Sequence, residues 1–166
     1  MRRLRYLVLA LMLGCNDGLQ PTVICDPHLV GVCGHVTFRG SVPDSTAAVY
    51  IVAYRRFPQS PADLFNFVPL PPQQLAVPGT GDSVEAYSLP LLNDQYHWVL
   101  AVWVKVGLVA GDTANEDAHL MEAGYYRDPA DTTKPGIVTV HSAGTGDIDF
   151  VVDFANMHSV SYFFPP

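Results

Sequence analysis

The sequence predicts an all-β chain folded as a single antiparallel β-sandwich of seven strands. Two observations lead to this fold class. Valine, isoleucine, threonine and aromatic residues recur in short runs, and 13 glycines and 14 prolines help to separate the runs. Long stretches with the 3.6-residue apolar period of an amphipathic helix are missing. The composition therefore favours a sandwich of short strands over a helical fold.

Seven runs are predicted to form the strands: 35–39, 48–57, 84–89, 96–106, 119–126, 137–141 and 148–154. The fourth run has almost no polar face, which predicts a central strand buried on both sides. Strict alternation along it places Tyr96, Trp98 and Leu100 on one face and the odd-numbered residues from His97 to Lys105 on the other. Packing in the core is the expected role of both tryptophans.

Two segments are predicted not to be strands. Residues 58–78 contain repeated prolines and are expected to form a rigid crossover. Within them, Ser60 followed by Pro61, with Asp63 two residues later, is typical of a helix start, so a short helix is expected there. Residues 111–117 are expected to form an acidic loop after the central strand. A single domain accounts for the whole pattern.

The charge balance limits the partners. The 166 residues include 9 Lys and Arg against 16 Asp and Glu, a formal net charge of −7. Removing three arginines with residues 1–14 would take the charge from −7 to −10. Nucleic acids and anionic membrane surfaces attract clustered positive charge, so no nucleic-acid partner is expected.

The first fifteen residues have the pattern of an export signal. Arg2, Arg3 and Arg5 precede the apolar run 6–13, and a small residue and a cysteine close it. The apolar run is shorter than the roughly 20 residues that a membrane-spanning helix needs. The pattern therefore predicts an exported protein.

The segment Leu11-Met12-Leu13-Gly14-Cys15 resembles the lipobox of bacterial lipoproteins. The resemblance implies that residues 1–14 are removed as a signal peptide and that Cys15 carries the lipid that anchors the protein to a membrane. An ordinary secretory signal that is cut nearby is the alternative. Asn16, rather than an aspartate, implies by the same resemblance an anchor in the outer membrane.

The remaining cysteines are expected to pair. Three cysteines leave one unpaired in an exported chain, so lipid on Cys15 would leave Cys25 and Cys33 to form a disulfide in an oxidising compartment. The bond would pin the tether, 15–33, to the start of the sandwich domain, 34–166. Chain-entropy reasoning gives so short a loop about 2–3 kcal/mol. Two buried free thiols are the alternative.

The predicted sandwich resembles a known fold family. The number and spacing of the predicted strands resemble those of uncharacterised bacterial envelope lipoproteins that have a transthyretin-like sandwich. The segments that contribute most to this resemblance are 125–129, 131–136, 148–150 and 153–154. That family also includes the Cna-B modules of surface adhesins. The resemblance covers roughly residues 34–155 and implies a fold and an envelope setting rather than an activity.

Candidate metal-binding and catalytic residues are few. Calcium takes six to eight oxygen ligands, and Asp112, Asn115, Glu116 and Asp117 are weak candidates for them. The segment lacks the glycine and the terminal glutamate of an EF-hand loop, and solvated loop acids are the alternative. The six histidines are scattered and no nucleophile or phosphate-binding motif is present. No catalytic residue and no resident cofactor are therefore predicted.

The aromatic tail is the remaining feature. Tyr162, Phe163 and Phe164 are expected to cover the sandwich itself, with a partner-binding surface as the alternative. Together these observations predict a non-enzymatic binding or scaffolding module for a protein or glycan partner in the cell envelope. A small exported hydrolase or a calcium-dependent ligand-binding domain is the alternative function.

Overall fold

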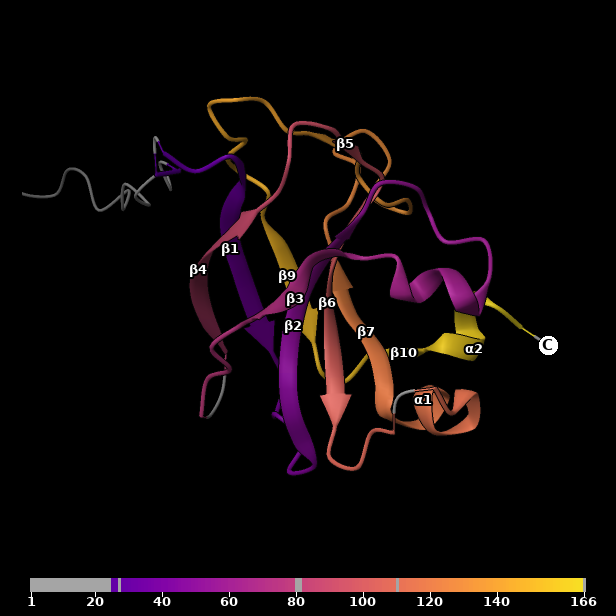
Figure 1. Cartoon of the computed structure of the whole chain (residues 1–166). Helices are drawn as coiled ribbons and strands as arrows, with labels where there is room; N and C mark the ends of the chain where they lie inside the picture. Colours follow the sequence, from indigo (N-terminus) through magenta and orange to yellow (C-terminus); the bar gives the residue numbers. More distant parts are fainter. Residues whose placement is uncertain (1–24, 27, 80–81, 110, 166) are drawn as a thin grey trace, which may run out of the picture.

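The computed structural model describes residues 25–26, 28–79, 82–109 and 111–165 (Figure 1). The chain is mainly β, with 44% strand and 11% helix. The strands are β1 (Gly31–Arg39), β2 (Thr46–Tyr54), β3 (Val68–Gln74), β4 (Ser83–Pro90), β5 (Gln95–Tyr96), β6 (Trp98–Lys105), β7 (Leu120–Tyr125), β8 (Val138–Thr139), β9 (Phe150–Asp153) and β10 (His158–Ser159). The helices are η1 (Pro61–Phe65), α1 (Thr113–His119) and α2 (Val160–Phe163).

The strands form three sheets. One sheet has the order β4-β1-β9, a second has the order β10-β7-β6-β2-β3, and β5 pairs with β8. Every pair of strands is antiparallel except β1 and β9, which run parallel. The structure confirms the coarser part of the fold prediction, a mainly β chain with several antiparallel sheets. Ten strands form among the described residues rather than seven, because the 96–106 run divides and both β3 and β10 were not predicted.

The two larger sheets enclose one hydrophobic core. Alternation along each strand sends every second side chain inward, so that β1, β2, β4, β6 and β9 all contribute buried residues to a single cluster. The sheets come closest where Gly124 of β7 meets β9. A side chain at Gly124 would collide with the carbonyl oxygen of Val151, so only glycine fits at this contact.

The central position of β6 confirms the prediction from its apolar run, but one face assignment is wrong. β6 lies between β2 and β7, and Trp98 and Trp103 are both buried. Tyr96 does not share a face with Trp98. The strand breaks at His97, whose N–H donates to the carbonyl of Tyr54 at 2.8 Å, and Tyr96 is fully buried in the core between the sheets. Strict alternation holds only along an uninterrupted strand, which explains the error.

The segment 58–78 is not a crossover alone. The expected short helix is present as η1, where the Asp63 carboxylate accepts hydrogen bonds from the N–H and the hydroxyl of Ser60. The segment also forms β3, contrary to the prediction. β3 is an edge strand beside β2, and an edge tolerates proline because it has no further strand to receive an N–H.

The predicted disulfide between Cys25 and Cys33 is present, with 5.7 Å between the two Cα atoms. β1 begins at Gly31, so the fully buried Cys33 belongs to this strand rather than to the tether. The bond therefore fastens the segment before β1 to the three-stranded sheet. The predicted signal peptide 1–14 and the predicted lipid site Cys15 lie outside the described residues. None of the helices formed by the described residues is long and apolar enough to cross a membrane.

Candidate functional site

The five-stranded sheet has a second apolar face that points away from the core between the sheets. Its centre is formed by cross-strand pairs of β2 and β6, in which Val52 lies opposite Leu100 and Tyr50 opposite Val102. These side chains alternate with those that enter the main core, so one short apolar run supplies both faces. This outer face is the floor of a pocket with a volume of about 280 Å³.

Short helices surround the floor. η1, α1 and α2 all lie on the outer side of the five-stranded sheet, while the three-stranded sheet covers its other side (Figure 1). β3 and β10, the two edge strands of this sheet, also contribute residues to the pocket. The residues from outside β2 and β6 that line the pocket are Pro61, Leu64, Phe65, Phe67, Pro72, Leu108, Glu116, Leu120, Met121, Glu122, His158, Ser159, Val160 and Phe163.

Trp98 anchors one end of the floor. Its side chain is 1% exposed, and the rings of Tyr54, Phe57, Tyr125 and Phe163 lie with their centroids 4.9–6.4 Å from that of Trp98. Such spacings are typical of favourable aromatic pairs. The Nε1 of Trp98 has no hydrogen-bond partner among the described residues. The outer face therefore has a small hydrophobic core of its own beside the pocket.

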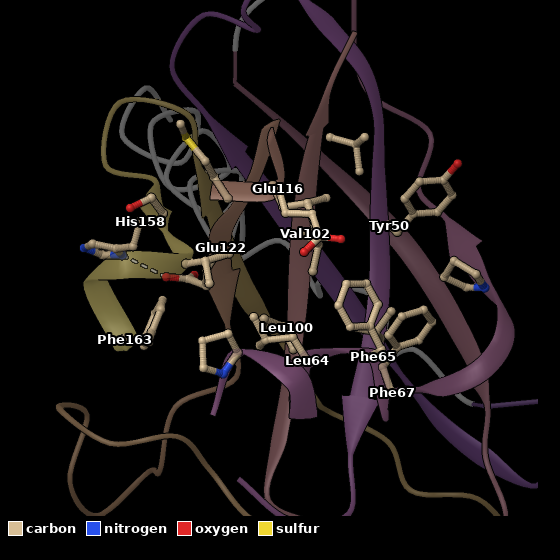
Figure 2. A pocket seen from close by; sticks show the side chains of 18 of the residues that line it. Tyr50, Leu64, Phe65, Phe67, Leu100, Val102, Glu116, Glu122, His158 and Phe163 are labelled. Atoms are coloured by element: carbon tan, nitrogen blue, oxygen red, sulfur yellow. Dashed lines mark hydrogen bonds and ion pairs between the residues drawn. The ribbon is translucent and has the colours of Figure 1, made fainter. Parts of the chain in front are cut away.

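Glu122 and His158 form an ion pair at one side of the pocket (Figure 2). Oε2 of Glu122 lies 2.8 Å from Nδ1 of His158, and Glu122 is 8% exposed. A β-bulge at Ala123 puts Glu122 opposite Val102 on the outer face, while Ala123 turns into the main core. Ala123 is the extra residue of the bulge, between Gly124, which pairs with Ala101, and Glu122, which pairs with Val102.

The burial of Glu122 affects its titration. Desolvation raises the pKa of its carboxyl group, although the hydrogen bond and the charge of His158 oppose this shift. The folded protein then holds this proton to a higher pH than the unfolded chain does. The carboxyl group consequently lowers the free energy of unfolding as the pH rises from its unfolded pKa through its folded pKa.

Glu116 is the second buried carboxylate of the pocket. It lies on α1, is 7% exposed, and points toward the centre of the pocket beside Val102 (Figure 2). Its Oε1 accepts one hydrogen bond, from the N–H of Gly111 at 2.7 Å. In the described part of the chain, no Lys, Arg or His side chain forms an ion pair with it.

The candidate calcium ligands do not converge. The expected acidic loop is instead the helix α1, because the Asp112 carboxylate caps its first N–H groups, those of Ala114 and Asn115. The side chain of Asn115 accepts from Val109, and that of Asp117 accepts from Ser161.

Each of these side chains therefore hydrogen-bonds to a different part of the fold. Within the described ranges, no group of three or more His, Cys, Asp or Glu side chains is arranged to hold a metal ion.

The three side chains of the aromatic tail differ in their exposure to solvent. Phe163, on α2, packs on Trp98 and lines the pocket, as expected for a tail that covers its own sandwich. Tyr162 stacks on His158 with 4.1 Å between ring centroids and remains 63% exposed. Phe164 ends α2 and is half-buried. Phe163 is thus the tail residue that belongs to the pocket.

No family model, curated protein or solved structure matches this chain. The chain is a small, mostly β domain of several sheets, and its site has to be interpreted from its own geometry. The sequence does not reveal that geometry, because the lining residues come from five segments, 50–54, 61–72, 98–108, 116–122 and 158–163. One signal was present: two of the three glutamates, Glu116 and Glu122, lie within four residues of the apolar pair Leu120-Met121 that opens β7.

Proposed function

We propose that this protein is a non-enzymatic binding module of the bacterial cell envelope, which takes an apolar ligand, or the apolar part of an envelope component, into the outer-face pocket. The pocket carries this proposal. Ligand sites are concave and mainly apolar with a few polar groups, and their volumes begin at about 300 Å³. A cavity of about 280 Å³, lined by aromatic and aliphatic side chains and two carboxylates, has this composition.

The envelope setting is supported by the N-terminal sequence and by the disulfide. The Leu11–Cys15 segment supports a lipid anchor on Cys15, and Asn16 supports its placement in the outer membrane. The Cys25–Cys33 bond fits an oxidising compartment outside the cytoplasm. Two facing sheets that share one core support a transthyretin-like sandwich as the fold.

The lining favours an apolar group over a surface glycan. A sugar offers many hydroxyl groups, each of which needs a hydrogen-bond partner when it is buried. The floor of this pocket consists of side chains such as Val52, Leu100 and Val102, which offer none. A glycan would leave its hydroxyls unsatisfied there, whereas an alkyl or aromatic group would not.

The proposal is tested with a neutral apolar dye, N-phenyl-1-naphthylamine, whose fluorescence rises in apolar surroundings. We expect saturable binding to the protein and at least tenfold weaker binding to Val102→Phe, because the larger ring fills the space above the floor. The matched control is Val84→Phe, which adds the same volume at an exposed position of β4 in the other sheet. Equal binding by both variants, or none by the wild type, would refute the pocket as the binding site.

The envelope setting has its own test. Mass spectrometry of the tagged protein, purified in mild detergent from its envelope fraction, is expected to show a mature chain that begins with lipidated Cys15 and brings a bound component with it. An unlipidated chain cut elsewhere would contradict the anchor and would leave a free secreted binding protein.

A small exported hydrolase is the second candidate, and the Glu122–His158 pair favours it. A carboxylate held on Nδ1 orients the imidazole and leaves Nε2 free to act as a base, as in acyl hydrolases. Hydrolysis of short p-nitrophenyl esters by the wild type, lost in His158→Ala, would support this candidate. If the wild type and His158→Ala both hydrolyse the esters no faster than the uncatalysed background, the hydrolase candidate is refuted and the binding module is the function that stands.

A further inference from the structure

We infer that the ligand of this pocket is an amphipathic amine, with a short apolar body on the sheet and a cationic head at Glu116. The inference rests on the proposed function and adds the chemical class of the ligand. It is carried by the charge of the lining, the position of the unpaired carboxylate and the aromatic walls.

The charge of the lining has one sign. Glu116 and Glu122 both line the pocket and are both nine-tenths or more buried. No lysine or arginine lines it among the described residues, and His158, its one titratable base, is already held by Glu122. An anionic head group would therefore meet two carboxylates in an apolar setting, where repulsion between like charges is strong.

Among the described residues, Glu116 is the pocket carboxylate that has no basic side chain beside it. A carboxylate removed from water is costly unless hydrogen bonds or an opposite charge compensate it. Glu116 receives a single N–H, from Gly111, on Oε1, and it points toward the middle of the cavity in Figure 2. An ammonium group at this position would supply both the missing hydrogen bonds and the missing charge.

The walls suit the same head group. Tyr50, Phe65 and Phe67 line the pocket, and in Figure 2 all three lie on the side of the cavity opposite His158. Aromatic faces attract cations, and the attraction is stronger when the cation is desolvated. An anion or a neutral head would gain nothing from these rings beyond contact area.

The size of the cavity limits the body of the ligand. At about 280 Å³ the pocket accepts one short alkyl chain or one small ring system rather than a two-chain lipid. Leu100 and Val52 provide the apolar surface on which such a body would lie. The occupant is therefore a small single-chain amine.

Calorimetric titration with three ligands of equal chain length tests the inference: octylamine, octan-1-ol and octanoate, all below their aggregation concentrations. The full chain with Cys15→Ser is used, so that no lipid is attached and no detergent competes. We expect octylamine to bind at least tenfold more tightly than octan-1-ol, a difference of about 1.4 kcal/mol. Octanoate is expected to bind most weakly of the three.

Two variants locate the head group. Glu116→Gln keeps the size of the side chain and an acceptor for the N–H of Gly111, so in this variant the affinity for octylamine should fall to that for octan-1-ol. The matched control is Glu85→Gln on β4, which removes the same charge from the other sheet and should change neither affinity.

The possible results separate the two proposals. If none of the three ligands binds, the proposed binding function fails together with the inference. If all three bind equally, the binding function stands and the amine preference is refuted. An amine preference that survives Glu116→Gln overturns the assignment of the head group to Glu116. If Glu116→Gln fails to fold, the order of the three ligand affinities for the protein that retains Glu116 still decides whether the pocket prefers an amine.

Discussion

Replacing Trp98 with alanine should cost about 3–5 kcal/mol of unfolding free energy, the range for removing a large buried aromatic side chain. The side chain is 1% exposed and has four aromatic neighbours, each of which adds a favourable pair. Phe57 and Phe163 belong to surface segments that can move into the gap. We therefore expect a loss in the lower half of the range, about 3–4 kcal/mol.

Urea unfolding followed by far-ultraviolet circular dichroism measures this loss, with an unchanged m-value showing that the same cooperative unit unfolds. The control Val84→Ala truncates a side chain that is 60% exposed and should change the free energy of unfolding by less than about 0.5 kcal/mol. Trp98→Ala should also abolish dye binding, because the ring lines the pocket. A loss below about 1 kcal/mol would refute the outer face as a second hydrophobic core.

Three further predictions concern stability. Reducing the Cys25–Cys33 bond should lower the free energy of unfolding by about 2–3 kcal/mol, measured by urea unfolding with and without reductant; an unchanged midpoint would show that the short loop contributes nothing. Glu122→Gln should gain stability relative to the wild type as the pH rises from 4 to 8, because the pKa of the wild-type Glu122 carboxyl group is raised in the fold; a melting temperature of the variant that falls relative to that of the wild type over this range would contradict that sign. EDTA should leave the melting temperature unchanged, since the four candidate calcium ligands serve different partners; a clear decrease would restore the calcium alternative.

The strands with clear alternation or an unbroken apolar run are predictable from sequence, and β1, β2, β4, β6, β7 and β9 are confirmed. The Cys25–Cys33 pairing was predicted from the cysteine count and is also present. These elements are predictable because the inward and outward positions of a strand are encoded locally. The split at His97 is not, since the chain bends there to pair Tyr96 with a distant strand.

The missed elements have physical reasons of their own. β3 contains prolines that normally argue against a strand, and only its place at a sheet edge makes them acceptable. α1 was expected to be a loop because of its charge, although Asp112 is a favourable N-cap residue. The pocket depends on which helices settle on which face of the sheet, and no local pattern contains that information.

Nuclear magnetic resonance can show at each residue whether the outer face of the five-stranded sheet binds the ligand. Backbone amide shifts of the full chain with Cys15→Ser are recorded during titration with octylamine. We expect the largest changes at Leu100, Val102, Glu116 and Glu122, with β4 and β9 unchanged. Shifts concentrated on β4 and β9, or no saturable shifts at all, would contradict it.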